Sequence, residues 1–355
     1  MTFATLMRRA VGASVDKPNR LRRARETYTS VRNRIKAPVW VDHPVNVQLE
    51  IHNYCNLWQC GKGCVHCNVK PSGGWNLPRG YMSDETIRYV VEYWGKHGAL
   101  TVAPYINGEY LLDSRCQWIS TLCRENGLGV VIDTNGSLYD KRESLVHPNN
   151  KQVRFSYSAV TPETYMQVHG ADLYREATAT IEWFLKNRES TQYPMLYFIT
   201  DRYNIGEIDE YLKRWIGRSH IVFFPLHEVD GIQTESEKTK VTAQDYWSQV
   251  TYKLTGKYPK QPYRPVDVYP DGTRRIRYFP RWIACQGSTS FSVNWQGLIL
   301  HCTDIPYSFN YGSVFENDML DVWRKRNRAK LNHSACSVCN VRSPSHDKIL
   351  QRYIV

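Results

Sequence analysis

The segment VQLEIHNYCNLWQCGKGCVHC, residues 47–67, begins with an apolar run typical of a β-strand and continues into a loop that holds Cys55, Cys60, Cys64 and Cys67. Cysteines separated by two to four residues are typical of metal or iron–sulfur ligands, whereas disulfide frameworks are typical of short secreted chains. A loop directly after a strand lies at the carboxyl edge of a parallel sheet or barrel, where the sites of α/β proteins gather. The segment therefore predicts a metal centre at the end of the first strand of an α/β fold.

Apolar, β-rich runs and amphipathic helical segments alternate along the chain as far as residue 225. Strands are expected at residues 47–51, 100–106, 129–132, 153–157, 195–199 and 221–225. Helices are expected at residues 83–96, 114–126, 162–168, 177–187 and 205–215. Because strands joined by crossover helices form parallel sheets, this alternation predicts an α/β protein with a parallel sheet, open or curled into a partial barrel.

The length of 355 residues allows one large α/β domain and a smaller appendage. Beyond the alternating part the chain is rich in Tyr, Lys and Pro, and the turn Pro270-Asp271-Gly272 predicts a hairpin between residues 266–269 and 274–278. We expect this middle segment to contact the substrate. The expected divisions are a basic leader over residues 1–44, the sheet domain over 45–229, the hairpin segment over 230–284 and a small irregular domain over 285–355.

The formal net charge is +12, and much of it lies near the start of the chain. Between Arg8 and Lys36 there are ten Lys and Arg residues, against Asp16 and Glu26. A basic arm of this kind suits contacts with nucleic acid or an acidic partner, although the simpler interpretation is a solvated amphipathic helix packed on the outside of the main domain. Both interpretations of the leader stay open.

The chain has no uninterrupted apolar stretch of signal-peptide length at its start, and no window approaches the length of a membrane span. We therefore expect a soluble, cytoplasmic protein without membrane contact, whose thiols stay reduced.

A second group of cysteines, Cys285, Cys302, Cys336 and Cys339, lies near the end of the chain. Four thiolates can complete the ligation of a 4Fe-4S cluster, whereas three leave one iron open to a substrate or cofactor. Zinc is the alternative at each group, because four thiolates also suit a structural zinc site. The cysteine spacing alone therefore predicts two metal centres of either kind.

The first group, Cys60-x3-Cys64-x2-Cys67, resembles the signature of the radical S-adenosylmethionine (SAM) superfamily. Residues 107–112, NGEYLL, follow the second expected strand and look like the family's Gly-Gly-Glu-Pro-Leu-Leu segment. Thr134-Asn135-Gly136 follows the third strand, Ser156-Tyr157-Ser158 the fourth and Asn204 the fifth, as in relatives. The resemblance implies that SAM contacts Asn107, Gly108, Glu109, Thr134, Asn135, Ser156, Ser158, Asn204 and Leu226.

The cysteine loop leaves its first ligand open. In many relatives Cys-Asn-Leu begins the cluster loop, and here those residues are Cys55-Asn56-Leu57. The resemblance therefore implies one of two ligand sets for a 4Fe-4S cluster. The preferred set is Cys60, Cys64 and Cys67, since its spacing needs no insertion, and Cys55 is the alternative to Cys60.

The second cysteine group resembles the twitch domain, a shortened relative of the SPASM domain that follows many radical SAM barrels. Trp295-Gln296-Gly297 is similar to its aromatic hairpin, and residues 312–323 are similar to its Gly-Asn-Ile…Leu-x-x-Trp helix. No Cys-x5-Cys-x3-Cys run follows Cys339. The resemblance therefore implies one auxiliary 4Fe-4S cluster, held by Cys285, Cys302, Cys336 and Cys339.

As a whole, the resemblance implies a partial (β/α)6 TIM-like barrel with a small C-terminal iron–sulfur domain. It implies two 4Fe-4S clusters, SAM as cofactor and an external electron donor such as flavodoxin or ferredoxin. The implied reaction is reductive cleavage of SAM to a 5′-deoxyadenosyl radical, which abstracts hydrogen from a substrate carbon. Peptide or protein modification by such an oxidoreductase is the leading expectation, and no individual catalytic residue is nominated.

Three alternatives accompany this expectation. A radical SAM enzyme of this layout can also dehydrogenate a small polyol or sugar, and the basic leader would suit a nucleotide or nucleic acid substrate. From a different class, a non-catalytic zinc protein could bind nucleic acid through the same leader. That last hypothesis leaves residues 107–112 and 134–136 without an explanation.

Overall fold

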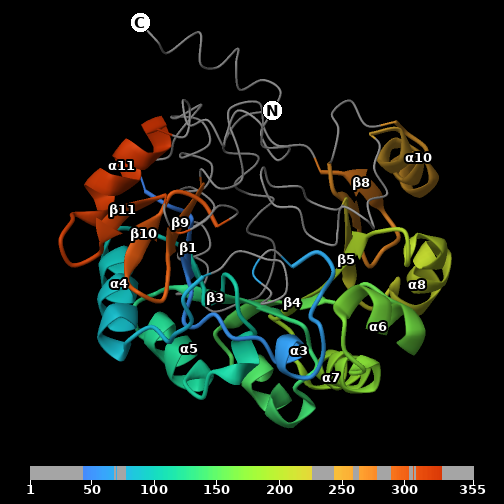
Figure 1. The fold of residues 1–355 in the computed structure, drawn as a ribbon, viewed down its shortest axis with the longest axis horizontal. Helices are drawn as coiled ribbons and strands as arrows, with labels where there is room; N and C mark the ends of the chain where they lie inside the picture. The colour runs from blue at the N-terminus through green and yellow to red at the C-terminus, as the bar shows by residue number, and fades with distance from the viewer. Residues whose placement is uncertain are drawn as a thin grey trace, which may run out of the picture.

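The computed structural model describes residues 43–67, 69, 77–225, 244–258, 264–277, 289–303, 307 and 309–329. Residues 1–42 of the expected basic leader lie outside the described part, as do Leu226, Cys285, Cys336 and Cys339. In the described part a curved sheet surrounds the centre of the molecule, and the helices lie on its outer side (Figure 1).

Six parallel strands form the central part of the sheet, in the order in which they occur along the chain. They are β1 (Asn46–Leu49), β2 (Thr101–Ala103), β3 (Gly129–Thr134), β4 (Asn150–Ser156), β5 (Tyr193–Thr200) and β6 (His220–Pro225). The helices that connect them are α3 (Asn56–Gln59), α4 (Asp84–Lys96), α5 (Cys116–Glu125), α6 (Pro162–His169), α7 (Tyr174–Asn187) and α8 (Ile208–Trp215), with 3-10 turns at Tyr110–Leu112, Tyr139–Val146 and Ile205–Glu207. The predicted parallel α/β sheet is therefore confirmed, and each expected strand and helix has a counterpart.

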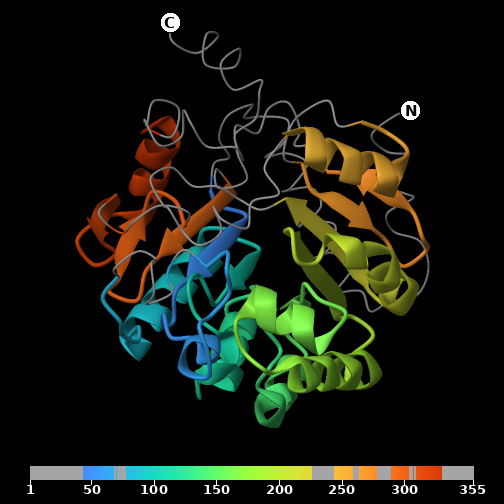
Figure 2. The same cartoon turned by 45° about the vertical axis from the view of Figure 1, so that its right-hand side comes forward.

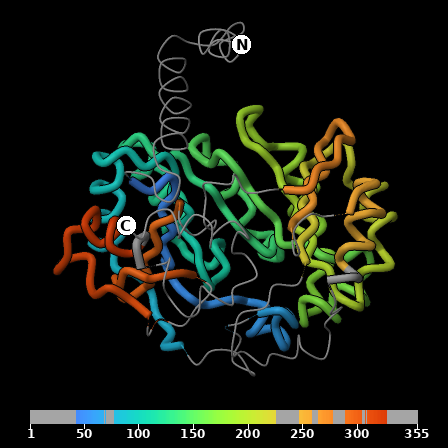
Figure 3. The backbone as a smooth tube through the Cα atoms, turned by 90° about the horizontal axis from the view of Figure 1, so that it is seen from above, coloured from blue at the N-terminus to red at the C-terminus, as the bar shows by residue number. Residues whose placement is uncertain are grey.

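Antiparallel strands extend the sheet at both edges. Beyond β6 lie β7 (Val266–Val268) and β8 (Arg274–Ile276), which form the predicted hairpin and follow helix α10 (Gln244–Thr255). At the other edge β9 (Ser290–Val293) pairs in parallel with β1, and β10 (Leu298–Leu300) and β11 (Asn310–Ser313) continue antiparallel before helix α11 (Met319–Ala329). The two edges lie on opposite sides of the curved sheet, as Figures 2 and 3 show.

The core lies between the outer face of the sheet and the helices. Outward-facing strand residues such as Val153 and Phe155 of β4 are fully buried, while the intervening Gln152 and Arg154 are partly exposed on the inner side. Helix α4 begins where sequence patterning places it, because the Ser83 hydroxyl accepts a hydrogen bond from the Thr86 amide at 3.1 Å. The inner side of the sheet is therefore left polar and available for a site.

Within the described residues, no helix combines the length and the apolar character needed to cross a lipid bilayer.

Candidate functional site

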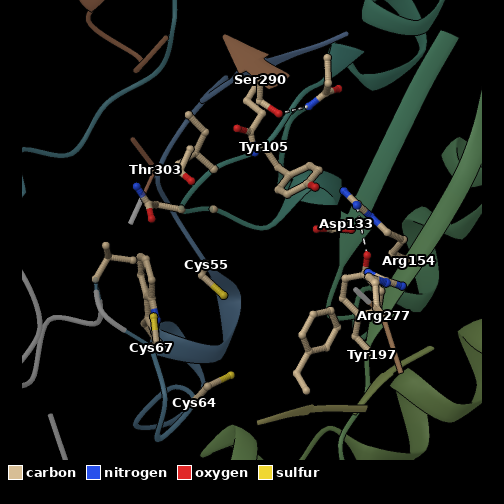
Figure 4. Close-up of a pocket in the computed structure, with 18 residues that line it drawn as sticks. Cys55, Cys64, Cys67, Tyr105, Asp133, Arg154, Tyr197, Arg277, Ser290 and Thr303 are labelled. Atoms are coloured by element: carbon tan, nitrogen blue, oxygen red, sulfur yellow. Dashed lines mark hydrogen bonds and ion pairs between the residues drawn. The ribbon is translucent and has the colours of Figure 1, made fainter. Parts of the chain in front are cut away.

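A cavity of about 490 Å³ lies on the inner side of the curved sheet (Figure 4). Its volume lies in the range of cavities that hold small molecules or cofactors, about 300–1,000 Å³. Side chains from β1, β3, β4, β5 and β6 line it, together with the cysteine loop and the segment after β2. In Figure 4, Cys55, Cys64 and Cys67 lie on one side, and Asp133, Arg154, Tyr197 and Arg277 lie on the other.

The four cysteines of the loop differ in their exposure and in their position relative to the cavity. Cys55, Cys64 and Cys67 are half-buried and line the cavity, whereas Cys60 is exposed and is absent from its lining. The short helix α3 separates Cys55, at its N-cap, from Cys60, at its C-cap, so the two thiols begin at opposite ends of one helical turn. This placement favours the alternative ligand, Cys55, over Cys60, which the spacing favoured.

Burial raises the pKa of the Cys55 thiol to about 12. The metal-free thiol is therefore neutral, and binding to a metal would displace its proton. Among the described residues, no three His, Cys, Asp or Glu side chains lie close enough together to hold a single metal ion. Cysteines around a 4Fe-4S cluster each bind a different iron, so their sulfur atoms lie farther apart than the ligands of one ion. Three half-buried thiols on one wall of a cavity are compatible with such a cluster.

The cysteine loop packs closely against the end of helix α6. The Lys62 amide donates to the Gly170 carbonyl at 2.8 Å, and the Val65 amide donates to the Val168 carbonyl at 2.9 Å. Gly170 has a φ of 71°, and a Cβ atom there would collide with the backbone of Gly63. The position of the loop therefore depends on glycine at the C-cap of α6.

One histidine connects this helix to a cavity thiol. His169 Nδ1 lies 3.4 Å from Cys64 Sγ, and His169 Nε2 accepts the Ser158 amide hydrogen at 3.1 Å. Full burial lowers the pKa of His169 to about 3, so the ring is neutral. Because Nε2 accepts, the single proton of the neutral ring lies on Nδ1 and is directed at the sulfur.

The Cys55-Asn56-Leu57 segment is tied to the end of β3. Asn135 Nδ2 donates to Asn56 Oδ1 at 2.9 Å and lies 3.8 Å from Cys55 Sγ. Asn56 Nδ2 in turn donates to Ser137 Oγ at 2.8 Å. These buried bonds bring together two of the motifs that the sequence separates by about eighty residues.

Glu109, the expected partner of the SAM amino group, uses both carboxylate oxygens within the protein. Its Oε1 accepts from Thr134 Oγ1 at 2.6 Å and from the Leu111 amide at 3.0 Å, and its Oε2 accepts from the Asn135 amide at 2.7 Å. Burial raises the pKa of Glu109. Of residues 107–109, Asn107 and Gly108 line the cavity, while Glu109 lies behind them and joins the ends of β2 and β3.

The expected residues after β4 and β5 meet each other rather than the cavity. Ser158 Oγ accepts from the Ile199 amide at 3.0 Å, and Asn204 Nδ2 donates to the Ser158 carbonyl at 2.9 Å. Ser156 is half-buried at the last position of β4. None of the three is among the residues that line the cavity, and Leu226 lies outside the described residues.

Of the second cysteine group, Cys302 alone falls within the described residues. It is half-buried and follows strand β10, and its neighbour Thr303 lines the cavity. The C-terminal part of the chain therefore reaches the same cavity as the first cysteine group.

The wall opposite the cysteines was missed by sequence reasoning. Asp133, Arg154 and Tyr197 come from β3, β4 and β5, and Arg277 follows β8. One signal was present, because a charged residue at an alternating position of an otherwise apolar strand marks the inner face of a barrel. Arg277 carries no such signal, because only the pairing of β7 with β6 brings it to the barrel.

No family model matches the sequence, and no curated protein matches it. Solved structures do match the fold. Streptococcus suis SuiB bound to S-adenosylmethionine is similar with a TM-score of 0.60 and 15% identity, over 95% of this chain and 80% of that chain. Native anSMEcpe with bound AdoMet and Kp18Cys peptide has a TM-score of 0.53 and 14% identity, over 84% of this chain and 88% of that chain. The described part of this chain therefore has the partial-barrel fold of the radical SAM enzymes.

Proposed function

We propose that the protein is a radical SAM enzyme whose first cluster is held by Cys55, Cys64 and Cys67. The observation that carries the proposal is that three half-buried thiols share one wall of a cavity inside a barrel of this fold. A 4Fe-4S cluster with one open iron would supply the electron that cleaves SAM to a 5′-deoxyadenosyl radical.

Residues of the chain itself would position SAM and shape the cavity around it. Asn107 and Gly108 present the segment after β2 to the cavity, and Glu109 fixes that segment to Thr134 and Asn135. The cavity lies on the inner side of the curved sheet, and a carbon-centred radical reaction there would require that water be kept from the reacting carbon. Thr134, Asn135, Ser156, Ser158, Asn204 and Leu226 stay proposed SAM-binding residues, with Ser158 and Asn204 supporting the ends of β4 and β5.

Hydrogen abstraction from a peptide or protein is the substrate class that we favour. One structure of similar fold, anSMEcpe, contains a peptide together with AdoMet, which supports this choice by analogy. Dehydrogenation of a small polyol or sugar and modification of a nucleotide are the alternatives. We further propose one auxiliary cluster on Cys285, Cys302, Cys336 and Cys339, an external donor such as flavodoxin or ferredoxin, and a reducing, cytoplasmic location.

The decisive experiment compares single cysteine variants after anaerobic reconstitution. Wild type is expected to bind about eight irons for two clusters and to form 5′-deoxyadenosine from SAM with dithionite. C55A and C64A are expected to lose cleavage more than about a hundredfold, because a missing ligand leaves the first cluster incomplete. C60A is the matched control from the same loop and should retain cleavage.

Two outcomes would contradict the proposal. Loss of cleavage in C60A with retention in C55A would return the ligand set to Cys60, Cys64 and Cys67. A colourless protein that binds zinc at both cysteine groups, and no iron, would instead support the non-catalytic nucleic-acid-binding alternative.

A further inference from the structure

Two arginines form part of the cavity wall opposite the cysteines. The side chain of Arg154 is 16% exposed and that of Arg277 is 27% exposed, and both line the cavity. Figure 4 shows Arg154, Arg277 and Tyr197 close together on the side of the cavity opposite Cys55 and Cys64. Burying a charged group to this extent costs free energy unless it has partners. The partners of each guanidinium group therefore indicate its role.

Arg154 is held rigidly from three directions. Its Nε forms an ion pair with Asp133, and its Nη1 donates to the Tyr197 hydroxyl at 3.1 Å. The Tyr105 and Tyr197 rings lie 5.4 and 5.5 Å from its guanidinium carbon. Among the described residues its Nη2 has no hydrogen-bond partner. The fork is therefore fixed in place with one of its N–H2 groups available to a ligand.

Arg277 is anchored in the same way from the other end of the sheet. Its Nε donates to Asp267 Oδ2 at 3.0 Å, and its Nη2 pairs with Asp267 Oδ1. The buried Asp267 also contacts His220 Nε2 at 2.8 Å, which fixes the carboxylate from behind. Among the described residues Nη1 of Arg277 has no acceptor. Asp267 does not line the cavity, so the arginine is the charged group of this pair that does.

A purely structural ion pair would use the guanidinium donors on its own carboxylate and would not need to line a cavity. Here two guanidinium groups line the same space, together with Asp133, and among the described residues each keeps one terminal nitrogen without a hydrogen-bond partner. Planar guanidinium forks of this kind match the oxygens of carboxylates and phosphates, and bonds between charged partners are about twice as strong as neutral ones. The chemistry that completes both arginines at once is an anion with at least two oxygens.

We propose that Arg154 and Arg277 together bind an oxyanion of the substrate, a carboxylate or a phosphate, on the wall opposite Cys55, Cys64 and Cys67. This inference rests on the proposed function, because it takes the cavity to be the site of hydrogen abstraction. An anion fixed at this wall directs the rest of the substrate across the cavity toward the cysteines. It thereby selects which carbon meets the radical.

The test measures anion binding to the reconstituted protein by titration calorimetry at constant ionic strength, with inorganic phosphate and acetate as probes and chloride as background. Wild type is expected to bind at least one probe saturably, and R154Q and R277Q should each raise the dissociation constant about tenfold, the loss of one charge-assisted contact. R218Q is the matched control, since Arg218 forms a half-exposed pair with Glu182 on the outside of the barrel. R154K, which keeps the charge without the fork, should restore part of the affinity.

The titrations with phosphate and acetate distinguish the kinds of anion that the site binds. Binding of phosphate alone indicates a phosphorylated substrate, and binding of acetate alone indicates a carboxylate. Equal affinities in wild type, R154Q and R277Q, or no saturable binding in wild type, would overturn the inference. A matching loss of SAM affinity in R154Q and R277Q would also overturn it, because the arginines would then hold the carboxylate of SAM.

The same preparation separates this inference from the proposed function. Wild type that binds anions through the arginines but forms no 5′-deoxyadenosine would defeat the proposed function alone. Formation of 5′-deoxyadenosine without arginine-dependent anion binding would defeat only the oxyanion site.

Discussion

His169 and Cys64 are joined by a contact of 3.4 Å between the ring Nδ1 and the thiol sulfur, and the Ser158 amide fixes the tautomer that makes the histidine the donor. A donor aimed at a cluster ligand stabilises the reduced, more negative state of the cluster. The end of α6 therefore does more than support the loop, because it places a fixed dipole beside one of the proposed cluster ligands.

Replacing His169 by Phe removes this donor while it keeps much of the ring volume. We expect the midpoint potential of the first cluster to fall by about 50 mV, since a hydrogen bond worth about 1 kcal/mol more in the reduced state changes a one-electron potential by that order. A redox titration followed by electron paramagnetic resonance measures the shift. H97F, at the exposed C-cap of α4, should leave the potential unchanged. An unchanged potential in H169F would show that the contact does not act on the cluster.

Gly170→Ala tests how the cysteine loop is seated on α6. Gly127 offers a matched control, because it has a φ of 74° and, among the described residues, no atom lies within 4 Å of an added Cβ, whereas a Cβ at Gly170 meets the Gly63 backbone. G127A should lower the free energy of unfolding by about 1 kcal/mol for the left-handed backbone alone. G170A should cost about 1–3 kcal/mol more through overpacking and should also lower the iron bound per chain. Equal losses in urea unfolding and equal iron contents would contradict the prediction.

Asn56→Ala should weaken both the fold and the cluster loop. It removes the acceptor of the Asn135 side-chain amide and the donor to the Ser137 hydroxyl, which costs about 2–6 kcal/mol at about 1–3 kcal/mol for each lost buried partner. We expect a matching drop in the free energy of unfolding and a lower iron content after reconstitution. N126A removes a half-buried bond within α5 and should cost less than about 1 kcal/mol with normal iron content. The prediction is wrong if the two variants behave alike.

Glu50 should make stability depend on pH. Burial raises its pKa to about 7, although the carboxylate accepts from Asn107 Nδ2 at 2.8 Å and from Tyr307. Because the folded pKa lies above the ordinary value of 4.5, the folded state binds the proton more tightly. This stabilisation is complete below about pH 4.5 and is lost as pH rises through 7, by about 3 kcal/mol in total.

In E50Q that component is absent, so the difference in free energy of unfolding between wild type and E50Q should change by about 3 kcal/mol between pH 4.5 and pH 8. E182Q, which removes a half-exposed carboxylate on the outside of the barrel, serves as the control for loss of a carboxylate away from Glu50. Parallel stability curves for wild type and E50Q would show that Glu50 titrates normally in the folded state.

The barrel could be predicted from sequence because its strands are separate apolar runs with clear helical segments between them. β4 begins three residues before its predicted start and β5 begins two residues before its own. Pairing with the neighbouring strands continues past the most apolar stretch of each. The α4 cap was predictable because a single local hydrogen bond, from the Thr86 amide to the Ser83 hydroxyl, sets it.

The first ligand of the cysteine loop could not be decided in the same way. Spacing favoured Cys60, but the helical turn α3 places Cys60 on the surface and Cys55 at the cavity. The cavity wall formed by Arg154 and Arg277 depends even more on contacts between distant segments. It forms only when β4 and the β7–β8 hairpin belong to one sheet. Such contacts depend on tertiary pairing, which single-sequence patterns do not record.

The parallel pairing of β9 with β1 joins Asn46 to Ser290, which lie 244 residues apart in the sequence. During synthesis the first strand must therefore wait for most of the polypeptide before its outer edge is covered. Contacts this distant in sequence slow folding, and an open strand edge is a place where nascent chains associate wrongly. Closure of that edge is a late event on the ribosome, and a chain truncated before residue 290 would expose the strand that leads directly into the cysteine loop.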